Sequence, residues 1–489
     1  MDGIGDSGQL HIVVFPWLAL GHMAPFLELS KALAMRGHLI SYLSTRRNIQ
    51  RLPKIPPHQS TLITLVELTL PPTEGLPEDA ESTMDLEVHK VPYLKMALDG
   101  LEEQVAEFLA TASPPVDWVV HDFAQYWTPR AAARAAVPCA FFSVYSPWMH
   151  AFIGAPRTSI VDEVPGTKPC RWTSFAPWLA LRQHEAAAVA AAAAQPNATG
   201  VSDVQRFIWT IEGCRVVVLR GPEAEETHPA EADWLALLQE LYGKSVISVG
   251  GLSPAARPQE EPAETAVKGG GGGGGGPPGG DDAFFGWLGK QAAGSVVYVA
   301  LGSEAELSPE TIHELALGLE QSGLPFFWAL RKPPGSPDRV ELLPPGFRDL
   351  VGGRGIVTMA WVPQIRVLAH PSVGGFLTHS GWSSVIEGLT MGRPLVLLPL
   401  YGDQCLISRA VTHMKAGVEI PRGEEDGGFT REGIAMALRL VMTGDQAEAL
   451  RGNARRAGEM FGDAARSDQC VDDLIRCLRI RRPPPPAAV

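Results

Sequence analysis

The chain has 489 residues, enough for two or three domains that each bury a full hydrophobic core. Its hydrophobic content of 45% is ordinary for a globular protein, and its net charge of −13 argues against broad binding to nucleic acid or to an anionic membrane. Six cysteines without metal-ligand spacing, and a polar N-terminus MDGIGDSGQL, predict a cytoplasmic protein with reduced thiols, no targeting peptide and no integral membrane segment.

The first half of the chain alternates short apolar runs with helical spacing, which indicates a parallel α/β sheet. Strands are predicted at residues 10–15, 38–44, 63–70, 118–121, 140–144, 215–219 and 246–249. A turn over 16–22 and a helix over 25–35 follow the first strand. His22 is therefore expected in the loop at the carboxyl end of that strand, where open sheets bind ligands, and Asp122 ends the fourth strand.

The middle of the chain changes in composition. Residues 178–194 are rich in alanine and are predicted to be helical. Residues 253–282 contain the unbroken glycine run 269–276, which we interpret as a flexible linker, because a phosphate-binding loop would need a strand before it and a helix after it.

The second half repeats the α/β pattern. Strands are predicted at residues 295–301, 325–330, 355–360, 374–378, 394–400 and 417–420, and helices at 309–322, 382–391, 431–442, 446–461 and 467–479. The terminal RRPPPPAAV is expected to fray. The fold class is therefore α/β, with two doubly wound Rossmann-like domains that face a cleft.

Polar side chains gather in the stretch WVPQIRVLAHPSVGGFLTHSGWSSVIEGLTMGRPLVLLPLYGDQ, from Trp361 to Gln404. It predicts a strand, a tight turn over 379–381, a helix and another strand. The first amides of a helix are unpaired and its dipole is positive there, so this turn is suited to a phosphate. Polar groups at the turn are His379, Ser380, Ser383 and Ser384.

The same stretch offers groups for the rest of a nucleotide sugar. Glu387 lies one helical turn further on and is placed to accept ribose hydroxyls. Asp403 and Gln404 follow the next strand, at the edge where a further polyol would bind. Trp361 offers a flat face for a base, and Gln364 offers an amide.

This stretch resembles, over its full length, the signature box of plant UDP-sugar-dependent glycosyltransferases, which contains Trp-x-Pro-Gln, Thr-His-Cys-Gly-Trp-Asn-Ser, Glu and Asp-Gln. Ser380 replaces the usual Cys, and Ser383 replaces the usual Asn. Ser383 keeps a hydroxyl donor, so we expect phosphate binding to survive with altered geometry. The variant His-Ser-Gly-Trp-Ser-Ser, with PWLALGHMAPFLELSKALAMRGH, STRRNIQRLP and VYVALGSEAELS, resembles the subgroup that glycosylates the sugars of already glycosylated small molecules.

The resemblance implies the family 1 architecture called GT-B. Residues 1–250 would form the N-terminal acceptor-binding domain, 251–282 the linker, and 283–465 the C-terminal UDP-sugar-binding domain. Residues 466–489 would form a helix that returns to the N-terminal domain, followed by the frayed tail.

The resemblance also implies the chemistry. A sugar hydroxyl needs a general base near the operating pH, and His22 matches the family's base. Asp122 matches its partner, which would fix the tautomer of the ring and stabilise the imidazolium. The neighbouring His121 is expected to face the other way. Transfer would invert the anomeric centre, with no cofactor and no metal, because UDP-sugar is a co-substrate and the chain has no obvious Asp-x-Asp pair.

Carried over by position, the family's donor site comprises Ser303, Trp361, Val362, Gln364, His379, Gly381, Trp382, Ser383, Ser384, Glu387, Tyr401, Asp403 and Gln404. The acceptor pocket is less defined, because each aromatic candidate also fits a core position. Its candidates are Tyr93, Ser143, Tyr145, Trp148, Met149 and Phe207.

The sequence thus predicts a monomeric UDP-sugar hexosyltransferase that acts on flavonoid or terpenoid glycosides. UDP-glucose is the expected donor, since the box ends in Gln404, and UDP-rhamnose or UDP-xylose stay open. Transfer to bare aglycones and a non-catalytic nucleotide-sugar binding protein are the alternatives. A nicotinamide dehydrogenase is disfavoured, because it needs Gly-x-Gly-x-x-Gly after the first strand, where this chain has Trp-Leu-Ala-Leu-Gly-His.

Overall fold

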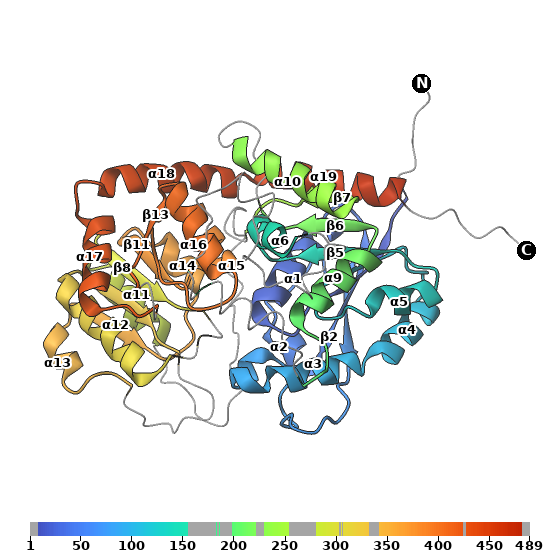
Figure 1. Ribbon diagram of the computed structural model, residues 1–489, viewed down its shortest axis with the longest axis horizontal. Helices are drawn as coiled ribbons and strands as arrows, with labels where there is room; N and C mark the ends of the chain where they lie inside the picture. Colours follow the sequence, from blue (N-terminus) through green and yellow to red (C-terminus); the bar gives the residue numbers. More distant parts are fainter. Residues whose placement is uncertain are drawn as a thin grey trace, which may run out of the picture.

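Two α/β halves lie side by side in the computed structural model of the protein (Figure 1). It describes residues 8–154, 182, 185, 198–221, 229–253, 280–302, 305, 307–331, 342–423 and 427–481. The glycine run 269–276, the tail 482–489 and most of the alanine-rich segment 178–194 lie outside the described residues.

Seven parallel strands form the first sheet, in the order β3-β2-β1-β4-β5-β6-β7. Their bounds are β1 His11–Phe15, β2 Leu39–Thr45, β3 Ile63–Leu68, β4 Trp118–His121, β5 Cys139–Ser143, β6 Val216–Leu219 and β7 Ser245–Ser248. Strands β1, β4, β5 and β6 are buried along their whole length, because helices cover both faces of a parallel sheet. The predicted strands are confirmed, with ends that shift by one or two residues.

The second sheet repeats this design with six parallel strands in the order β10-β9-β8-β11-β12-β13. Their bounds are β8 Val296–Ala300, β9 Phe326–Ala329, β10 Gly355–Thr358, β11 Val373–Thr378, β12 Leu395–Leu397 and β13 Gly417–Glu419. Both orders are those of a doubly wound Rossmann-like sheet, so the predicted fold class is confirmed. An open cleft between the halves stays a prediction.

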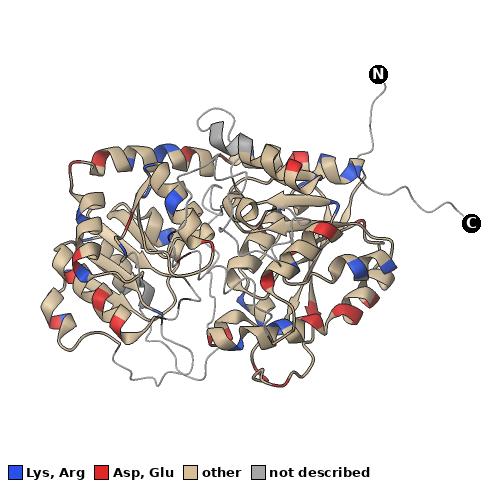
Figure 2. Cartoon of the chain, viewed as in Figure 1, with Lys and Arg blue, Asp and Glu red and all other residues tan. Residues whose placement is uncertain are grey.

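Helices cover the two sheets. The first half contains α1 Leu20–Ala34, α2 Arg46–Arg51, the short turns η1 Thr83–Asp85 and η2 Val88–Lys90, α3 Val91–Asp99, α4 Glu102–Thr111, α5 Thr128–Arg134, α6 Pro147–Ile153, α9 Asp203–Gly213 and α10 Pro229–Tyr242. The second contains α11 Gly280–Leu288, α12 Pro309–Ser322, α13 Phe347–Val351, α14 Gln364–Ala369, α15 Trp382–Thr390, α16 Gln404–His413, α17 Arg431–Met442 and α18 Ala447–Phe461. Acidic and basic residues are interspersed along the helices of both halves (Figure 2).

The predicted start of the first helix is wrong. Helix α1 begins at Leu20, five residues before the expected 25, and contains Pro25. The prediction relied on the preference of proline for the first helical position. The loss of one helical hydrogen bond at Pro25 is outweighed by packing, because Met23 and Phe26 are fully buried. His22 therefore lies on the first turn of a helix, not in a loop.

The last helix, α19 Ala464–Ile480, lies along the first half (Figure 1). Its apolar face, with Val471 and Leu474, is buried in the same cluster as Ile12 of β1. The indole of Trp118 donates a hydrogen bond to the carbonyl oxygen of the nearby Leu478 at 3.1 Å. The chain therefore crosses from the second half back to the first, where α19 packs on the first sheet.

Candidate functional site

Each sheet has one switch point, where the chain connections change direction between two neighbouring strands, and the predicted site residues gather there. In the first sheet this point lies between β1 and β4, which His22 and Asp122 follow. In the second it lies between β8 and β11, which Gly302 and His379 follow. Open α/β sheets bind ligands at such points, just beyond the carboxyl ends of the strands.

His22 and Asp122 are joined although 100 positions separate them in sequence. The Nδ1 atom of His22 lies 2.7 Å from Oδ2 of Asp122. The carboxylate is fully buried and also accepts backbone N–H bonds from Trp17 at 3.1 Å and from Phe123 at 2.8 Å. These bonds fix the carboxylate, and a fixed carboxylate favours the tautomer of His22 that keeps its proton on Nδ1 and its lone pair on Nε2.

Aromatic rings surround the imidazole. The ring centre of Tyr145 lies 5.5 Å from that of His22, and Phe123 lies 5.9 Å away. Phe207 extends this group, 6.1 Å from Tyr145. The neighbouring His121 is fully buried, and burial lowers its pKa to about 4, so it is neutral at pH 7. The structure thus brings one predicted acceptor residue, Tyr145, beside the predicted base, and a second, Phe207, against Tyr145.

The other acceptor candidates lie in different surroundings. Ser143 is fully buried, and its Oγ accepts the backbone N–H of Tyr145 at 3.2 Å. Trp148 is buried with its edge against Trp382 of the other half, with ring centres 5.4 Å apart. Met149 lies on the first turn of α6, and Tyr93 packs so closely on the backbone at 75 that only glycine fits there. Ser143 and Trp148 thus support the pocket region from within the core, and contact with an acceptor stays a prediction for all four.

Two glycines form a slot for the ring of His379. A Cβ atom at Gly302 would lie 2.7 Å from this ring, and one at Gly381 would lie 2.4 Å from its Nε2. Gly302 also has a positive φ of 85°, which glycine adopts without strain. Burial lowers the pKa of His379 to about 4, so the ring meets a ligand as a neutral hydrogen-bonding group. Ser303 lies outside the described residues.

Helix α15 starts directly after this slot, with Gly381 as its N-cap. Ser383 and Ser384 lie on its first turn, where N–H groups lack helical partners. Ser380 precedes the helix with a positive φ of 68°, and its buried hydroxyl has no hydrogen-bond partner among the residues that the structure describes. The helix start therefore joins amides and hydroxyl groups, which is the chemistry that a phosphate needs.

Glu387 and Gln364 meet one turn further along α15. The Nε2 atom of Gln364 donates to Oε2 of Glu387 at 2.7 Å. Burial raises the pKa of the Glu387 carboxyl, and the bond from Gln364 opposes this rise. Trp361 precedes them with 43% of its surface exposed, so its ring is open to a planar ligand, whereas Val362 is buried in the core.

Asp403 brings the second half to the catalytic pair. Burial raises the pKa of its carboxyl to about 6, and His22 in its protonated form opposes this rise, so the two side chains are within electrostatic reach across the halves. The Oε1 atom of Gln404 accepts backbone N–H bonds from Leu400 at 2.8 Å and Tyr401 at 3.2 Å. This leaves its NH₂ group for a ligand, and the ring of Tyr401 is 48% exposed.

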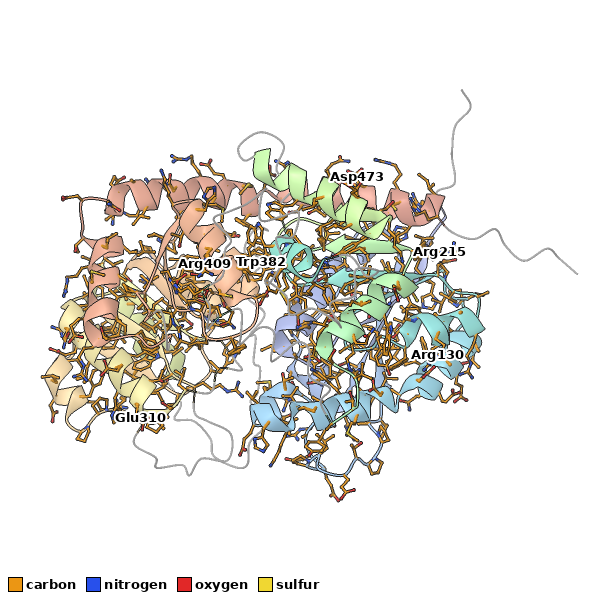
Figure 3. The ribbon with its side chains drawn as sticks, viewed as in Figure 1. Arg130, Arg215, Glu310, Trp382, Arg409 and Asp473 are labelled. Carbon is orange, nitrogen blue, oxygen red and sulfur yellow. The ribbon has the colours of Figure 1, made fainter. Side chains whose placement is uncertain are left out.

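Sequence reasoning missed two neighbours of the site. Phe123 follows Asp122 directly, so its position beside His22 could have been found from the strand-end argument. Arg220 follows β6, and its guanidinium donates from Nη1 to Oγ of Ser383 at 2.6 Å. The contact joins the two halves of the chain, and no sequence motif marks it. Trp382, whose indole donates to the carbonyl oxygen of Arg220 at 2.8 Å, lies where the halves meet (Figure 3).

Two features are absent from the described residues. They contain no group of three or more His, Cys, Asp or Glu side chains that could hold a metal ion. None of the helices in the same residues is long and apolar enough to cross a membrane.

The chain is similar to known proteins over nearly its whole length. A model of the family "UDP-glucoronosyl and UDP-glucosyl transferase" matches residues 284–455. UDP-glycosyltransferase 91D2 of Stevia rebaudiana is 41% identical over 97% of this chain and 96% of the relative. Anthocyanidin-3-O-glucoside rhamnosyltransferase of Petunia hybrida is 32% identical, with 96% of each chain covered. The crystal structure of Glycyrrhiza uralensis UGT73P12 with glycyrrhetinic acid 3-O-monoglucuronide superposes with a TM-score of 0.75 at 22% identity, covering 97% of this chain and 96% of that one.

Proposed function

The chain belongs to family 1 of the plant UDP-glycosyltransferases, enzymes that move a sugar from UDP to a small molecule, and from this premise we propose its substrates and its catalytic residues. The donor is UDP-glucose, and the acceptor is a sugar hydroxyl of a flavonoid or terpenoid glycoside. His22 is the general base and Asp122 its partner. The observation that carries the proposal is the 2.7 Å contact between these two side chains, within electrostatic reach of Asp403 from the other half.

The proposed step follows from this geometry. Asp122 holds the proton of His22 on Nδ1, so Nε2 takes the proton of the acceptor hydroxyl as its oxygen attacks the anomeric carbon. The bond from that carbon to the diphosphate oxygen breaks, and its electron pair leaves with UDP. Attack from the side opposite the leaving group inverts the anomeric centre. Asp403 and the NH₂ group of Gln404 would bind hydroxyls of the transferred sugar.

The diphosphate would be met by groups of the protein. The first N–H groups of α15, the neutral ring of His379 and the hydroxyls of Ser383 and Ser384 are the proposed donors, and we propose that no metal takes part. Transfer that persists unchanged in excess EDTA would support this. Strict dependence on added Mg²⁺ would contradict it.

The acceptor class and the donor sugar have weaker support. The name of the petunia relative gives both a glucoside as acceptor and rhamnose as the transferred sugar. At 32% identity it supports an acceptor that already carries a sugar, and it keeps UDP-rhamnose as a second candidate donor. Pockets of this type are mostly apolar with few polar anchors, which the aromatic group around Tyr145 and Phe207 fits.

The test is UDP release from a crossed panel. UDP-glucose, UDP-rhamnose and UDP-xylose are combined with free and glycosylated flavonoids and terpenoids, for wild type and His22→Ala. We expect release that requires a glycoside acceptor and falls about 10³-fold in His22→Ala with UDP binding unchanged. Release with bare aglycones only would contradict the acceptor class, and full activity in His22→Ala would contradict the base.

Cytosolic location and a monomeric state also stay proposals. No two of the five cysteines in the described residues are joined by a disulfide, and four of the five are buried, as expected for a protein in a reducing compartment. A tagged protein seen in the secretory pathway, or a dimer mass in light scattering, would contradict them.

A further inference from the structure

Arg220 belongs to the first half of the chain by sequence and to the donor site of the second half by its contacts. Its backbone N–H donates to the carbonyl oxygen of Ser143 at 3.2 Å, which holds it at the carboxyl edge of the first sheet. Its carbonyl oxygen accepts the indole N–H of Trp382 at 2.8 Å, and its Nη1 donates to Oγ of Ser383 at 2.6 Å. Main chain and side chain thus both reach the first turn of α15.

The surroundings of Arg220 differ from those of the other buried arginines. Only 2% of its surface is exposed. Arg51 and Arg206 are also buried, and each forms an ion pair, with Asp85 and Asp99 respectively. In the part of the chain that the structure describes, Arg220 forms no ion pair, and its side chain donates to the uncharged oxygens of Ser383 and of the Gly251 carbonyl.

A buried cation without a contacting carboxylate is costly unless an anion balances it. Burial lowers the pKa of Arg220 to about 10, which still leaves it charged at pH 7, and Glu387 and Glu28 oppose this fall from a distance. His379 is neutral at pH 7, so it adds no charge at this helix start. The guanidinium and the dipole of α15 therefore both favour an anion at the first turn.

We propose that Arg220 is a positioning residue of the donor site, which holds Ser383 and supplies positive charge from the opposite domain where the diphosphate of UDP-sugar binds. The inference rests on the proposed function and extends it to a residue outside the signature box. It also gives a physical role to Ser383 in place of the usual Asn. The shorter side chain cannot reach as far toward a ligand as an amide, and its hydroxyl is oriented by Arg220 instead.

Arg220 is not the only contact that holds the halves together. The indole of Trp382 packs edge-on against Trp148 of the first half, with ring centres 5.4 Å apart. Its hydrogen bond goes to the main chain of Arg220, which a side-chain substitution keeps. A variant at Arg220 is therefore expected to fold and to keep the halves joined.

The first test is the affinity for UDP, measured by calorimetry on the full chain for wild type, Arg220→Gln, Arg220→Lys and Arg393→Gln. Arg393 is the matched control, because it is half-buried, follows the opposite end of α15 and donates to the carbonyl oxygens of Leu368 and His370. We expect Arg220→Gln to weaken UDP binding about tenfold, Arg220→Lys to recover part of the loss, and Arg393→Gln to stay within about twofold of wild type.

A second measurement tests whether Arg220 orients Ser383 or only stabilises the fold. If Arg220 acts through Ser383, then Ser383→Ala combined with Arg220→Gln should cost no more than Arg220→Gln alone. Arg220→Gln should also raise the KM for UDP-sugar more than it lowers kcat. Wild-type UDP affinity in Arg220→Gln with a lower unfolding midpoint would overturn the proposal in favour of a structural brace. Losses of UDP affinity that add fully in the double variant would also overturn the proposal.

Failure of the proposed function would look different. Wild type that binds UDP and transfers no sugar to any acceptor would contradict the proposed substrates, while the affinities of the Arg220 variants would still decide the inference. Wild type that fails to bind UDP would overturn both.

Discussion

The two halves of the molecule use the same sheet design for different kinds of site. In the second half the candidate site is local, because His379, the start of α15 and Glu387 come from one continuous stretch. In the first half the site is assembled from distant residues, since His22 and Asp122 are 100 positions apart. The second half thus carries its proposed donor site on one continuous stretch, and the first half joins the proposed base to a buried carboxylate that orients it.

From this contrast we expect substitutions in the two halves to change different kinetic parameters. Loss of a group that orients the base should lower kcat and leave UDP binding intact. Loss of geometry at the helix start should weaken UDP binding, with a smaller effect on kcat. Changes that affect both parameters equally would remove the distinction between the halves.

The largest effect is expected for Asp122→Asn. The amide keeps the shape of the side chain, but it has one acceptor oxygen where the carboxylate has two, and it carries no charge. The tautomer of His22 with its proton on Nδ1 and the imidazolium both lose support. We expect kcat to fall about 10²–10³-fold with UDP affinity unchanged. Asp117→Asn is the matched control, because Asp117 accepts the backbone N–H of His11 at the opposite end of β4. A loss of UDP affinity in Asp122→Asn equal to its loss of kcat would contradict this separation.

The next effect is expected for Gly381→Ala in the second half. Its new Cβ would lie 2.4 Å from Nε2 of His379, and no strain arises from φ, so the ring itself must move. We expect UDP to bind about 10–100-fold more weakly, since a charge-assisted hydrogen bond is misplaced. Gly286→Ala, in α11, meets nothing within 4 Å and should bind UDP as wild type does. Equal affinities of the two variants for UDP in calorimetry would show that the position of the His379 ring does not affect UDP binding.

The contrast also explains how much the sequence predicts. The strands and the order of functions along Trp361 to Gln404 follow from local pattern, because that site is continuous in the chain. The contact between His22 and Asp122 needed the strand-end argument together with the family resemblance. Arg220 and Phe123 were not predicted, because which side chains meet across a sheet edge or between halves depends on packing that no short segment encodes. The start of α1 was mispredicted for the same reason, since burial of Met23 overrode the signal of Pro25.

A smaller effect, on stability, tests whether the two halves meet at Asp403. Its folded pKa of about 6 lies above the unfolded value of about 3.9, so the folded state holds the extra proton between these values. Stability relative to an Asn variant should therefore fall as the pH rises from about 4 to 6 and stay low above that range. We expect Asp403→Asn to be about 1–2 kcal/mol more stable than wild type at pH 7 in urea unfolding, and equal to it below pH 4.

The second half of this test uses His22. A protonated His22 lowers the pKa of Asp403, so at a pH where His22 is charged the advantage of Asp403→Asn should grow in a His22→Ala background. An unchanged advantage would mean that the two side chains do not sense each other across the halves.

The smallest effect is expected at Ser380, which lies between His379 and Gly381, the N-cap of α15. Its hydroxyl is fully buried and has no partner in the described part of the chain, and its φ of 68° is costly for any residue with a Cβ. Ser380→Ala removes the unpaired hydroxyl and should raise the free energy of unfolding by about 1 kcal/mol. Ser380→Gly also removes the backbone cost but loosens the unfolded chain, so it should gain no more than about 1 kcal/mol further. If instead Ser380→Ala is less stable than wild type and also binds UDP more weakly, this prediction is wrong. The hydroxyl of Ser380 would then contribute to UDP binding.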